Sequence, residues 1–254
     1  MYLEYCNPTG NFREYAKTNG TCVTTLIKNF KKQGWKTYGV ERNRAKLNEN
    51  YFSVIDTPNK SYFLGLLSAD GYVVKPGRGQ YRVGISLQER DVKILQDLKK
   101  DMEFEGNVIF RPKRNKKWQA TYSICMSSNI LANDLIKLGV TPRKSFNLRF
   151  PTDSEVPKEF MRDYIRGLFD GDGCITSSPR RKQLCFMFMI CGSDKTCEGV
   201  RDILYNNFHL GSGKVIVRIH NDGIRKPLYF YYIGGNYQLQ KLYHYLYDDA
   251  ETFL

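Results

Sequence analysis

Several stretches of this chain have the hydrophobic spacing of β-strands. Apolar and polar side chains alternate over residues 81–88 and again over 117–124. Runs at 184–191, 214–220 and 228–233 are also strand-like in composition. A period of two places neighbouring side chains on opposite faces of a strand. The pattern therefore predicts antiparallel sheets that bury one face and leave the other polar.

Between these strands, apolar residues recur at helical spacing. We predict helices at 59–69, 91–101, 128–138, 195–207 and 237–247. Helices and strands follow one another in the same order twice. Each half of the chain is therefore interpreted as helix, two strands, helix, two strands, helix, and the predicted fold class is α+β.

Two short segments, one in each half, are versions of each other. Residues 63–71 read FLGLLSADG and residues 165–173 read IRGLFDGDG. The copies keep a constant spacing, so that Asp70 is equivalent to Asp172. A repeated helix with one carboxylate per copy indicates two half-domains that bring two acids together, which is the arrangement of a metal site.

Small residues recur on one face of each repeated helix. Gly65 and Ala69 are four residues apart and share a face, as Gly167 and Gly171 do in the second copy. Such a face allows two helix backbones to approach closely. The alternative is a tolerated flaw that costs about 1 kcal/mol per glycine relative to alanine. Glycine occurs at equivalent positions of both copies despite this cost, which favours a helix–helix interface over a tolerated flaw.

Both segments resemble the signature helix of the LAGLIDADG homing endonucleases at the glycines, the aspartates and the apolar positions. The flanking sequences, KSYFLGLLSADGYV and DYIRGLFDGDGCI, look like the family too, and the resemblance covers roughly residues 47–254. It implies two pseudo-symmetric αββαββα half-domains, at 51–150 and 151–254. It also implies a monomer with internal pseudo-two-fold symmetry, whose antiparallel sheets form a saddle over double-stranded DNA.

The segment before the first half-domain, residues 1–50, has a character of its own. Ala16, Gly20 and Leu26 have the spacing of a helix-turn-helix, which predicts a small helical N-terminal extension followed by a polar linker. On that interpretation a recognition helix carries Val23, Thr24, Thr25 and Lys28. The alternative is a helical extension that contacts no bases.

Charge supports a polyanionic partner. The 254 residues carry a formal net charge of +13 and have a pI of about 9.3. Lysine and arginine displace counterions from phosphate, so an excess of this size favours nucleic acid over a merely basic protein.

Cysteine usage indicates a reducing environment. The seven cysteines are odd in number, form no CxxC pair and lie partly in apolar runs such as LCFMFMIC. We interpret them as reduced thiols, which suits a bacterial or phage-infected cytoplasm or an organelle. No signal peptide and no membrane span are evident in the sequence.

The chemistry expected of the resemblance is metal-dependent phosphodiester hydrolysis. Hard cations prefer carboxylate oxygen, so the resemblance implies that Asp70 and Asp172 bind Mg²⁺. The alternative is an ordinary helix-terminal Asp-Gly turn, which suits two equivalent sites poorly because acids there oppose the helix dipole. Asp170 is left out of the site because its counterpart is Ser68.

Two further residues are candidates by resemblance. Lys144 falls where the family usually has a catalytic lysine, and Gln88 matches a position that often holds glutamine. The alternatives are a phosphate contact for Lys144 and a surface role for Gln88. Ser193 is the expected equivalent of Gln88, and Lys144 has no evident partner before Leu254. We therefore expect the two DNA strands to be cut at unequal rates.

The polar sheet faces and hairpin loops supply candidate DNA contacts. In the first half these are Arg82, Ser86, Lys113, Lys116, Lys117, Gln119 and Thr121. In the second half they are Arg180, Arg181, Lys182, Gln183, Lys214, Arg218, His220, Arg225 and Lys226. The alternative for each of them is a solvated surface side chain.

The resemblance implies a site-specific homing endonuclease that cuts both strands of a long asymmetric DNA target, an activity linked to intron mobility. The alternative on the same scaffold is a cleavage-deficient DNA-binding regulator or an RNA-splicing maturase. The presence of both Asp70 and Asp172 favours the enzyme, because a pure binder has no need for paired acids.

Overall fold

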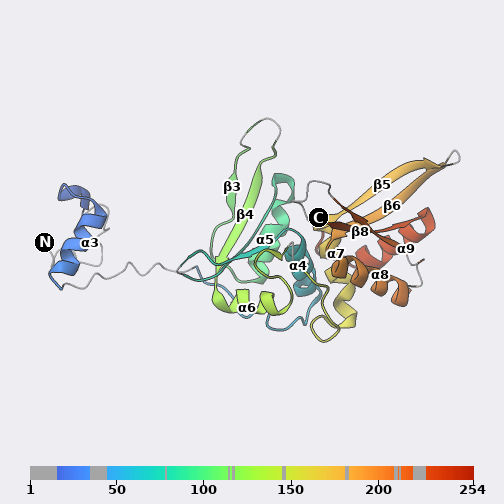
Figure 1. Cartoon of the computed structure of the whole chain (residues 1–254), viewed down its shortest axis with the longest axis horizontal. Helices are drawn as coiled ribbons and strands as arrows, with labels where there is room; N and C mark the ends of the chain where they lie inside the picture. The colour runs from blue at the N-terminus through green and yellow to red at the C-terminus, as the bar shows by residue number, and fades with distance from the viewer. Residues whose placement is uncertain are drawn as a thin grey trace. The chain divides into compact units, whose positions relative to one another are not determined.

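A computed structural model of the chain describes residues 16–34, 45–77, 79–113, 115, 118–144, 147–180, 183–208, 211, 213–219 and 227–254. The chain divides into two compact units, residues 1–45 and 46–254. The larger unit confirms the predicted α+β class, since it repeats one order of helices and strands (Figure 1).

The first repeat follows the predicted order of helix, two strands, helix, two strands and helix. Its elements are α4 (Pro58–Ala69), β1 (Tyr72–Val74), β2 (Arg82–Gln88), α5 (Val92–Asp101), β3 (Ile109–Arg111), β4 (Thr121–Ser127) and α6 (Asn129–Lys137). The strand predicted over 117–124 therefore begins later, at Thr121. Trp118, which precedes it, is 60% exposed.

The second repeat has the same order. Its elements are α7 (Met161–Asp172), β5 (Gly173–Arg180), β6 (Gln183–Gly192), α8 (Asp194–Phe208), β7 (Lys214–Arg218), β8 (Leu228–Gly234) and α9 (Asn236–Tyr247). Among the described residues, no helix is long and apolar enough to cross a membrane.

The two sheets have equivalent topologies. Each has four strands, in the order β1-β2-β4-β3 and β5-β6-β8-β7, and every pairing is antiparallel. Their registers agree as well: Gly84 lies opposite Tyr72, and Met189 lies opposite Cys174, which are the second residues after the two repeated aspartates. The halves are thus related residue by residue.

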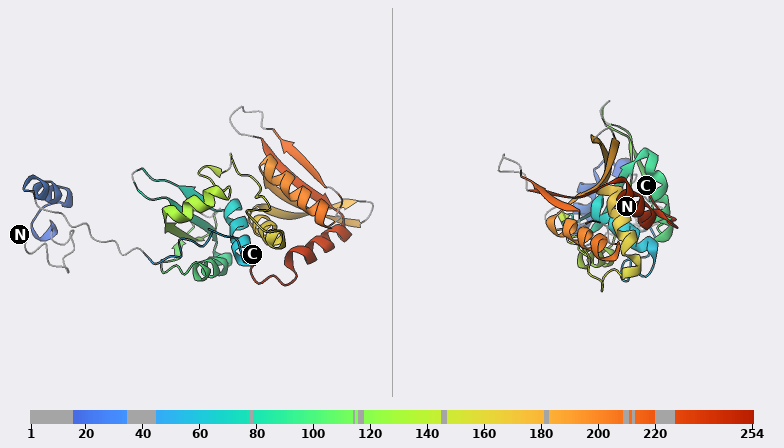
Figure 2. Two further views of the ribbon diagram at one scale, coloured as in Figure 1. Left: turned by 90° about the horizontal axis from the view of Figure 1, so that it is seen from below. Right: turned by 90° about the vertical axis from the view of Figure 1, so that its right-hand side faces the viewer.

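Each sheet buries one face only. Val83 and Ile85 of β2 and Phe188 and Ile190 of β6 are at most 2% exposed and belong to the hydrophobic core. Their neighbours in sequence point the other way, because side chains alternate along a strand. In the two further views the helices of the larger unit gather on one side of its sheets (Figure 2).

Helices α4 and α7 form the centre of the larger unit and pack against each other. A Cβ atom on Gly65 would overlap the carbonyl oxygen of Tyr164, and a Cβ on Gly167 would overlap that of Tyr62. The two contacts are equivalent under the sequence repeat, which is the signature of a pseudo-two-fold axis. Only glycine permits backbones to meet this closely.

The smaller unit is described over residues 16–34. Residues 16–18 are helical, a turn follows at Gly20 (φ +59°), and α3 spans Val23–Lys32. Ala16, Leu26 and Phe30 are at most 3% exposed, so the helix packs through one apolar face.

Candidate active site and nucleic-acid interface

The two repeated acids stand at the ends of the paired helices. Helix α4 begins at Pro58, with the Thr57 side chain accepting a hydrogen bond from the backbone N–H of Lys60, and ends with Asp70 as its C-cap. Asp172 is the last residue of α7. Because the helices run side by side from equivalent starts, their final residues lie at the same end of the pair.

A small residue makes room for one of the carboxylates. A Cβ on Gly171 would overlap that of Ala69 and would lie 3.3 Å from Oδ2 of Asp70. Gly65, Ala69, Gly167 and Gly171 therefore all lie where α4 meets α7. The close approach at this end of the helix pair brings the acids within electrostatic reach of each other.

The surroundings of the acids disfavour their charged forms. Restricted hydration, together with the charge of Asp172, raises the pKa of Asp70 to about 6, although Lys144 opposes the shift. Restricted hydration also raises the pKa of Asp172, and Lys144 opposes that shift as well. Both side chains remain open to solvent on one side. A cation placed between them would stabilise both charged carboxylates.

Lys144 lies against the C-terminal end of α4. Its Nζ donates a hydrogen bond to the carbonyl oxygen of Ser68 over 2.7 Å and another to that of Ala69. Burial lowers the pKa of Lys144, while the charges of Asp172 and Asp70 raise it. The lysine thus binds unpaired helix carbonyls and holds a positive charge beside the acids. Within the described residues, α7 receives no equivalent lysine.

An open cavity of about 910 Å³ connects Asp70 with the first sheet. Gln88, Ser86 and Thr121 line it, so Gln88 shares a cavity with the acid. Ser193, its register equivalent, has a different role: its Oγ accepts from the backbone N–H of Thr196 and donates to the carbonyl of Leu148. Ser193 therefore caps α8.

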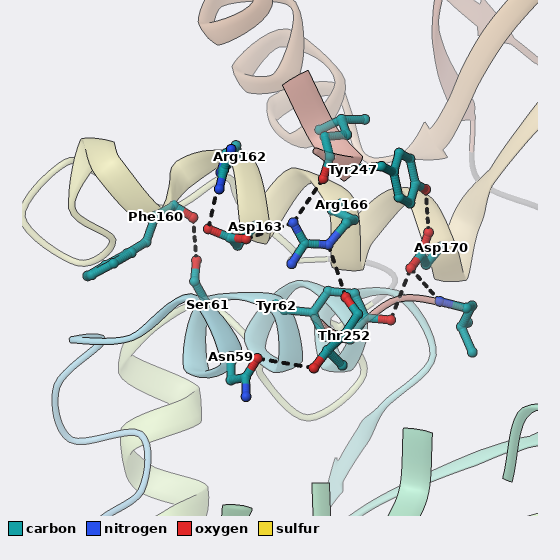
Figure 3. Close-up of polar contacts among 12 residues, drawn as sticks. Asn59, Ser61, Tyr62, Phe160, Arg162, Asp163, Arg166, Asp170, Tyr247 and Thr252 are labelled. Carbon is teal, nitrogen blue, oxygen red and sulfur yellow. Dashed lines mark hydrogen bonds and ion pairs between the residues drawn. The ribbon is translucent and has the colours of Figure 1, made fainter. Parts of the chain in front are cut away.

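Asp170 belongs to a structural network (Figure 3). Its carboxylate accepts hydrogen bonds from Tyr62, Tyr247 and the backbone N–H of Leu254, at 3.0, 2.6 and 2.8 Å. These contacts join α4, α7, α9 and the C-terminal segment. Three donors contact this carboxylate, which also lines the cavity of Asp70.

Arg166, also on α7, is a buried cation that the sequence analysis missed (Figure 3). It is 1% exposed and pairs with Asp163 at 2.7 Å. It also donates to the carbonyls of Leu246 and Thr252, at 2.9 and 3.1 Å. The available signal was an acid and a base three residues apart on one helix face, Asp163 and Arg166. The network fastens the C-terminal segment to the helix pair.

The donor set fits a hard divalent cation. Magnesium usually takes one or two protein carboxylates and completes its shell with water and substrate phosphate. Asp70 and Asp172 supply such a pair. No group of three or more His, Cys, Asp and Glu side chains suited to a metal occurs in the described part of the chain. The protein thus offers two carboxylates here and leaves room for ligands from elsewhere.

Some candidate DNA contacts lie on the faces that no helix covers. Arg82, Ser86 and Thr121 belong to the open face of the first sheet, and Lys214 and Arg218 to that of the second. Lys113 and Gln119 are exposed beside β3 and β4. Arg180 and Gln183 pair across the β5–β6 hairpin, and nothing of their side chains is described. The remaining candidates lie outside the described residues: Lys116, Lys117, Arg181, Lys182, His220, Arg225 and Lys226.

The sequence analysis also missed two thiols beside the acids. Cys174 follows α7, and Cys191 occupies the register position that Ser86 has in the first sheet. Burial, the charge of Asp172 and that of Cys174 raise the pKa of Cys191 to about 11. Cys191 thus stands opposite Asp172 where Ser86 stands in the first sheet, and Cys174 also lines the cavity of Asp70.

Comparisons with known proteins find similarity in the second half of the chain and in the fold. Residues 159–246 match the model of the LAGLIDADG-like domain. No curated protein sequence matches this chain. The solved structures similar to this chain include the LAGLIDADG meganuclease I-AabMI bound to uncleaved DNA, with 14% identity and a TM-score of 0.49 over 78% of this chain and 85% of that chain. They also include the I-LtrWI LAGLIDADG homing endonuclease bound to target DNA, with 16% identity and a TM-score of 0.47 over 78% of this chain and 84% of that chain. Mesophilic variants of the homing endonuclease I-DmoI have 18% identity and a TM-score of 0.48 over 78% of this chain and 92% of that chain.

Proposed function

We propose that this chain, whose residues 159–246 match the model of the LAGLIDADG-like domain, is a site-specific homing endonuclease that cuts both strands of double-stranded DNA with a divalent metal. The first half has the same order of elements and the same sheet topology, so the domain is present twice. The protein then acts as a monomer that contacts an asymmetric target.

One observation carries the proposal: two pseudo-symmetric helices deliver one carboxylate each to a single place. The reciprocal contacts of Gly65 and Gly167 fix the pair, and Asp70 and Asp172 end it. Both carboxylates have raised pKa values because burial disfavours their charged forms. A shared cation would stabilise the charged forms of two partly desolvated acids that lie close together. Two negative charges would not by themselves strengthen binding to an anionic duplex.

In this account the residues divide the work as follows. Asp70 and Asp172 bind Mg²⁺, which neutralises charge on the phosphate and activates water when bound. Lys144 orders the end of α4 and contributes positive charge near the scissile phosphates. Gln88, exposed in the cavity of Asp70, orients solvent on one side. The open sheet faces hold the duplex.

We propose that the N-terminal unit adds a second contact with DNA. Thr25, Lys28 and Lys32 are exposed and follow one another along the side of α3 opposite its buried residues. The described residues 16–34 contain four lysines and no acid, which suits a phosphate-rich surface. The tight turn at Gly20 before α3 is consistent with a helix-turn-helix.

The test is a cleavage selection on randomised duplex DNA with magnesium, run beside the same selection in EDTA. The proposal predicts one enriched long sequence that is cut only with the metal. Asp172→Asn serves as a control that should enrich the same sequence by binding without cutting it. Enrichment by binding alone for the wild type would favour the cleavage-deficient regulator, and no enrichment of any duplex would reject the proposal.

A further inference from the structure

The open faces of the two sheets differ in chemistry. On the central strands of the first sheet, most outward positions carry hydrogen-bonding groups: Arg82, Ser86, Gln88, Thr121, Ser123 and Ser127. On the central strands of the second sheet, most outward positions carry sulfur-containing or aromatic side chains: Cys185, Met187, Met189, Cys191, Phe230 and Tyr232. The predicted polar face is therefore largely apolar in the second half.

The burial pattern fixes which face these residues occupy. Phe188 and Ile190 are 2% and 0% exposed and pack into the core beneath β6. Met187 and Met189 alternate with them and so point away from the helices. Each is partly exposed. The second sheet thus presents a thioether and thiol surface where no helix covers it.

The position and charge of this surface identify its partner. It is continuous with the acids, because Cys191 lies within electrostatic reach of Asp172. Lys214 and Arg218 project from the same face on the neighbouring strand, and the described strands of this sheet contain no acidic residue. A partner here must be anionic at its edges and must offer apolar groups at its centre.

The major groove of DNA meets both requirements. Its edges are phosphate, and thymine presents its C5-methyl group in the groove, where apolar side chains contact it. We infer that the second sheet recognises thymine methyl groups through Met187, Met189 and their neighbours, so that one half of the target is read by apolar contact. This inference rests on the proposed function, because it assumes that the sheet faces a duplex.

The test is a thymine-to-uracil scan of the selected duplex, measured as equilibrium binding of the full chain in EDTA. Uracil lacks only the methyl group, so pairing and hydrogen-bond pattern are kept. Each lost methyl contact should weaken binding about fourfold. The sensitive thymines should lie on one side of the cleavage centre. Sensitivity at no thymine, or equal sensitivity on both sides, would overturn the inference.

Matched variants assign the effect to the sheet. Met187→Gln with Met189→Gln keeps side-chain length and replaces apolar contact by an amide. The double variant should bind thymine and uracil duplexes equally at the sensitive positions. Ser86→Ala, on the equivalent face of the first sheet, should leave the sensitivity intact. A melting temperature near that of wild type confirms that each variant folds.

The outcomes separate this inference from the proposal on which it rests. If the double variant still binds tightly and still discriminates thymine from uracil, the role of Met187 and Met189 is rejected. The endonuclease proposal stays in place in that case. Absence of any duplex binding by the wild type would reject both. Methyl-dependent binding without cleavage would support the inference and reject the enzyme.

Discussion

At the scale of single residues, Asp70 and Asp172 share one site but have different surroundings. Lys144 acts on both carboxylates, but Asp70 shares a cavity with Ser86 and Gln88 of the first sheet, whereas Cys191 lies beside Asp172. Desolvation is the first cause of the raised pKa of both. The energetic consequence can be measured without DNA, because it is a property of the folded protein.

The first prediction concerns stability and pH. The pKa of Asp70 is raised to about 6, so the folded state binds its proton more tightly than the unfolded state does. The contribution of Asp70 to stability should therefore be greatest below the unfolded pKa, near 4, and should be lost as pH rises through about 6. Asp70→Asn removes this cost and, with solvent screening allowed for, should stabilise the protein at pH 8 by roughly 1 kcal/mol.

Melting temperatures in EDTA check this prediction. The variant should melt a few degrees above wild type at pH 8, and the two should converge at pH 4. A variant that melts lower at pH 8 would contradict the account of a desolvated acid. Below about pH 6 the wild type should need more magnesium for the same cleavage rate, because protons compete with the metal for the carboxylate.

The second prediction concerns Lys144. Removing a preorganised charged donor beside the phosphates should slow cleavage, on the order of 100-fold. Since α7 has no equivalent lysine among the described residues, Lys144→Met should slow mainly the strand that the wild type cuts faster, so that fewer nicked circles accumulate on a supercoiled plasmid than with the wild type. Lys137→Met is the control, because Lys137 is an exposed partner of Asp134 on α6. Equal slowing of both strands would contradict the asymmetry.

Single residues also show where sequence interpretation ends. Asp70 and Asp172 stand out because their helices repeat, whereas Lys144 and Gln88 were reached by resemblance alone. Nothing in the sequence places Cys191 beside Asp172, since that contact depends on the register between β5 and β6. The spacing of Asp163 and Arg166 suggests a pair on one helix face, but nothing in the sequence indicates that Arg166 also binds the carbonyls of Leu246 and Thr252.

At the scale of elements, the helix pair is the feature on which the site depends. A Cβ at Gly65 would meet backbone atoms of Tyr164 and Leu168, and backbone cannot rotate away as a flexible side chain can. The contact is reciprocal at Gly167. Overpacking here moves both helices and, with them, both acids.

The third prediction follows from that contact. Gly65→Ala and Gly167→Ala should each lower stability by about 1–3 kcal/mol or more, despite the higher helix propensity of alanine. Gly234→Ala is the control, because the nearest atom to its added Cβ is 3.8 Å away. Chemical denaturation of the three variants decides the point. If the helix variants match the control, the close backbone contact is refuted.

The N-terminal unit is the second element with its own prediction. If α3 reads DNA, a chain lacking residues 1–45 should protect a shorter stretch of the target, with the loss at one end only. Cleavage at the centre should continue, because the acids belong to the other compact unit. Nuclease footprints of the two forms on one labelled duplex make the comparison. Identical footprints would leave the unit without a DNA role.

Elements also show what pattern can predict. Helices α4 and α7, strands β2 and β6, and the order of each half follow from hydrophobic period and repetition. Strands β1 and β3 have three residues each, too few to show a period. Strand β5, with the sequence GCITSSPR, has residues of low strand propensity and forms because β6 pairs along its whole length.

At the scale of the whole molecule, two similar halves produce one asymmetric protein. The net charge of +13 attracts a duplex without regard to sequence. Specificity must come from the sheets, and their faces differ: hydroxyl and guanidinium groups on one, sulfur and aromatic groups on the other. Such a surface suits a target whose two halves have different sequences.

The central claim is that one carboxylate from each half forms a single metal-dependent cutting site, and one measurement addresses it directly. A supercoiled plasmid bearing the selected target is incubated with magnesium and with wild type, Asp70→Asn or Asp172→Asn, and each protein's affinity for the target is measured in parallel. The account predicts linear product from wild type alone, with all three proteins bound equally well. Linearisation by either variant at the wild-type rate, or by wild type in EDTA, would contradict it.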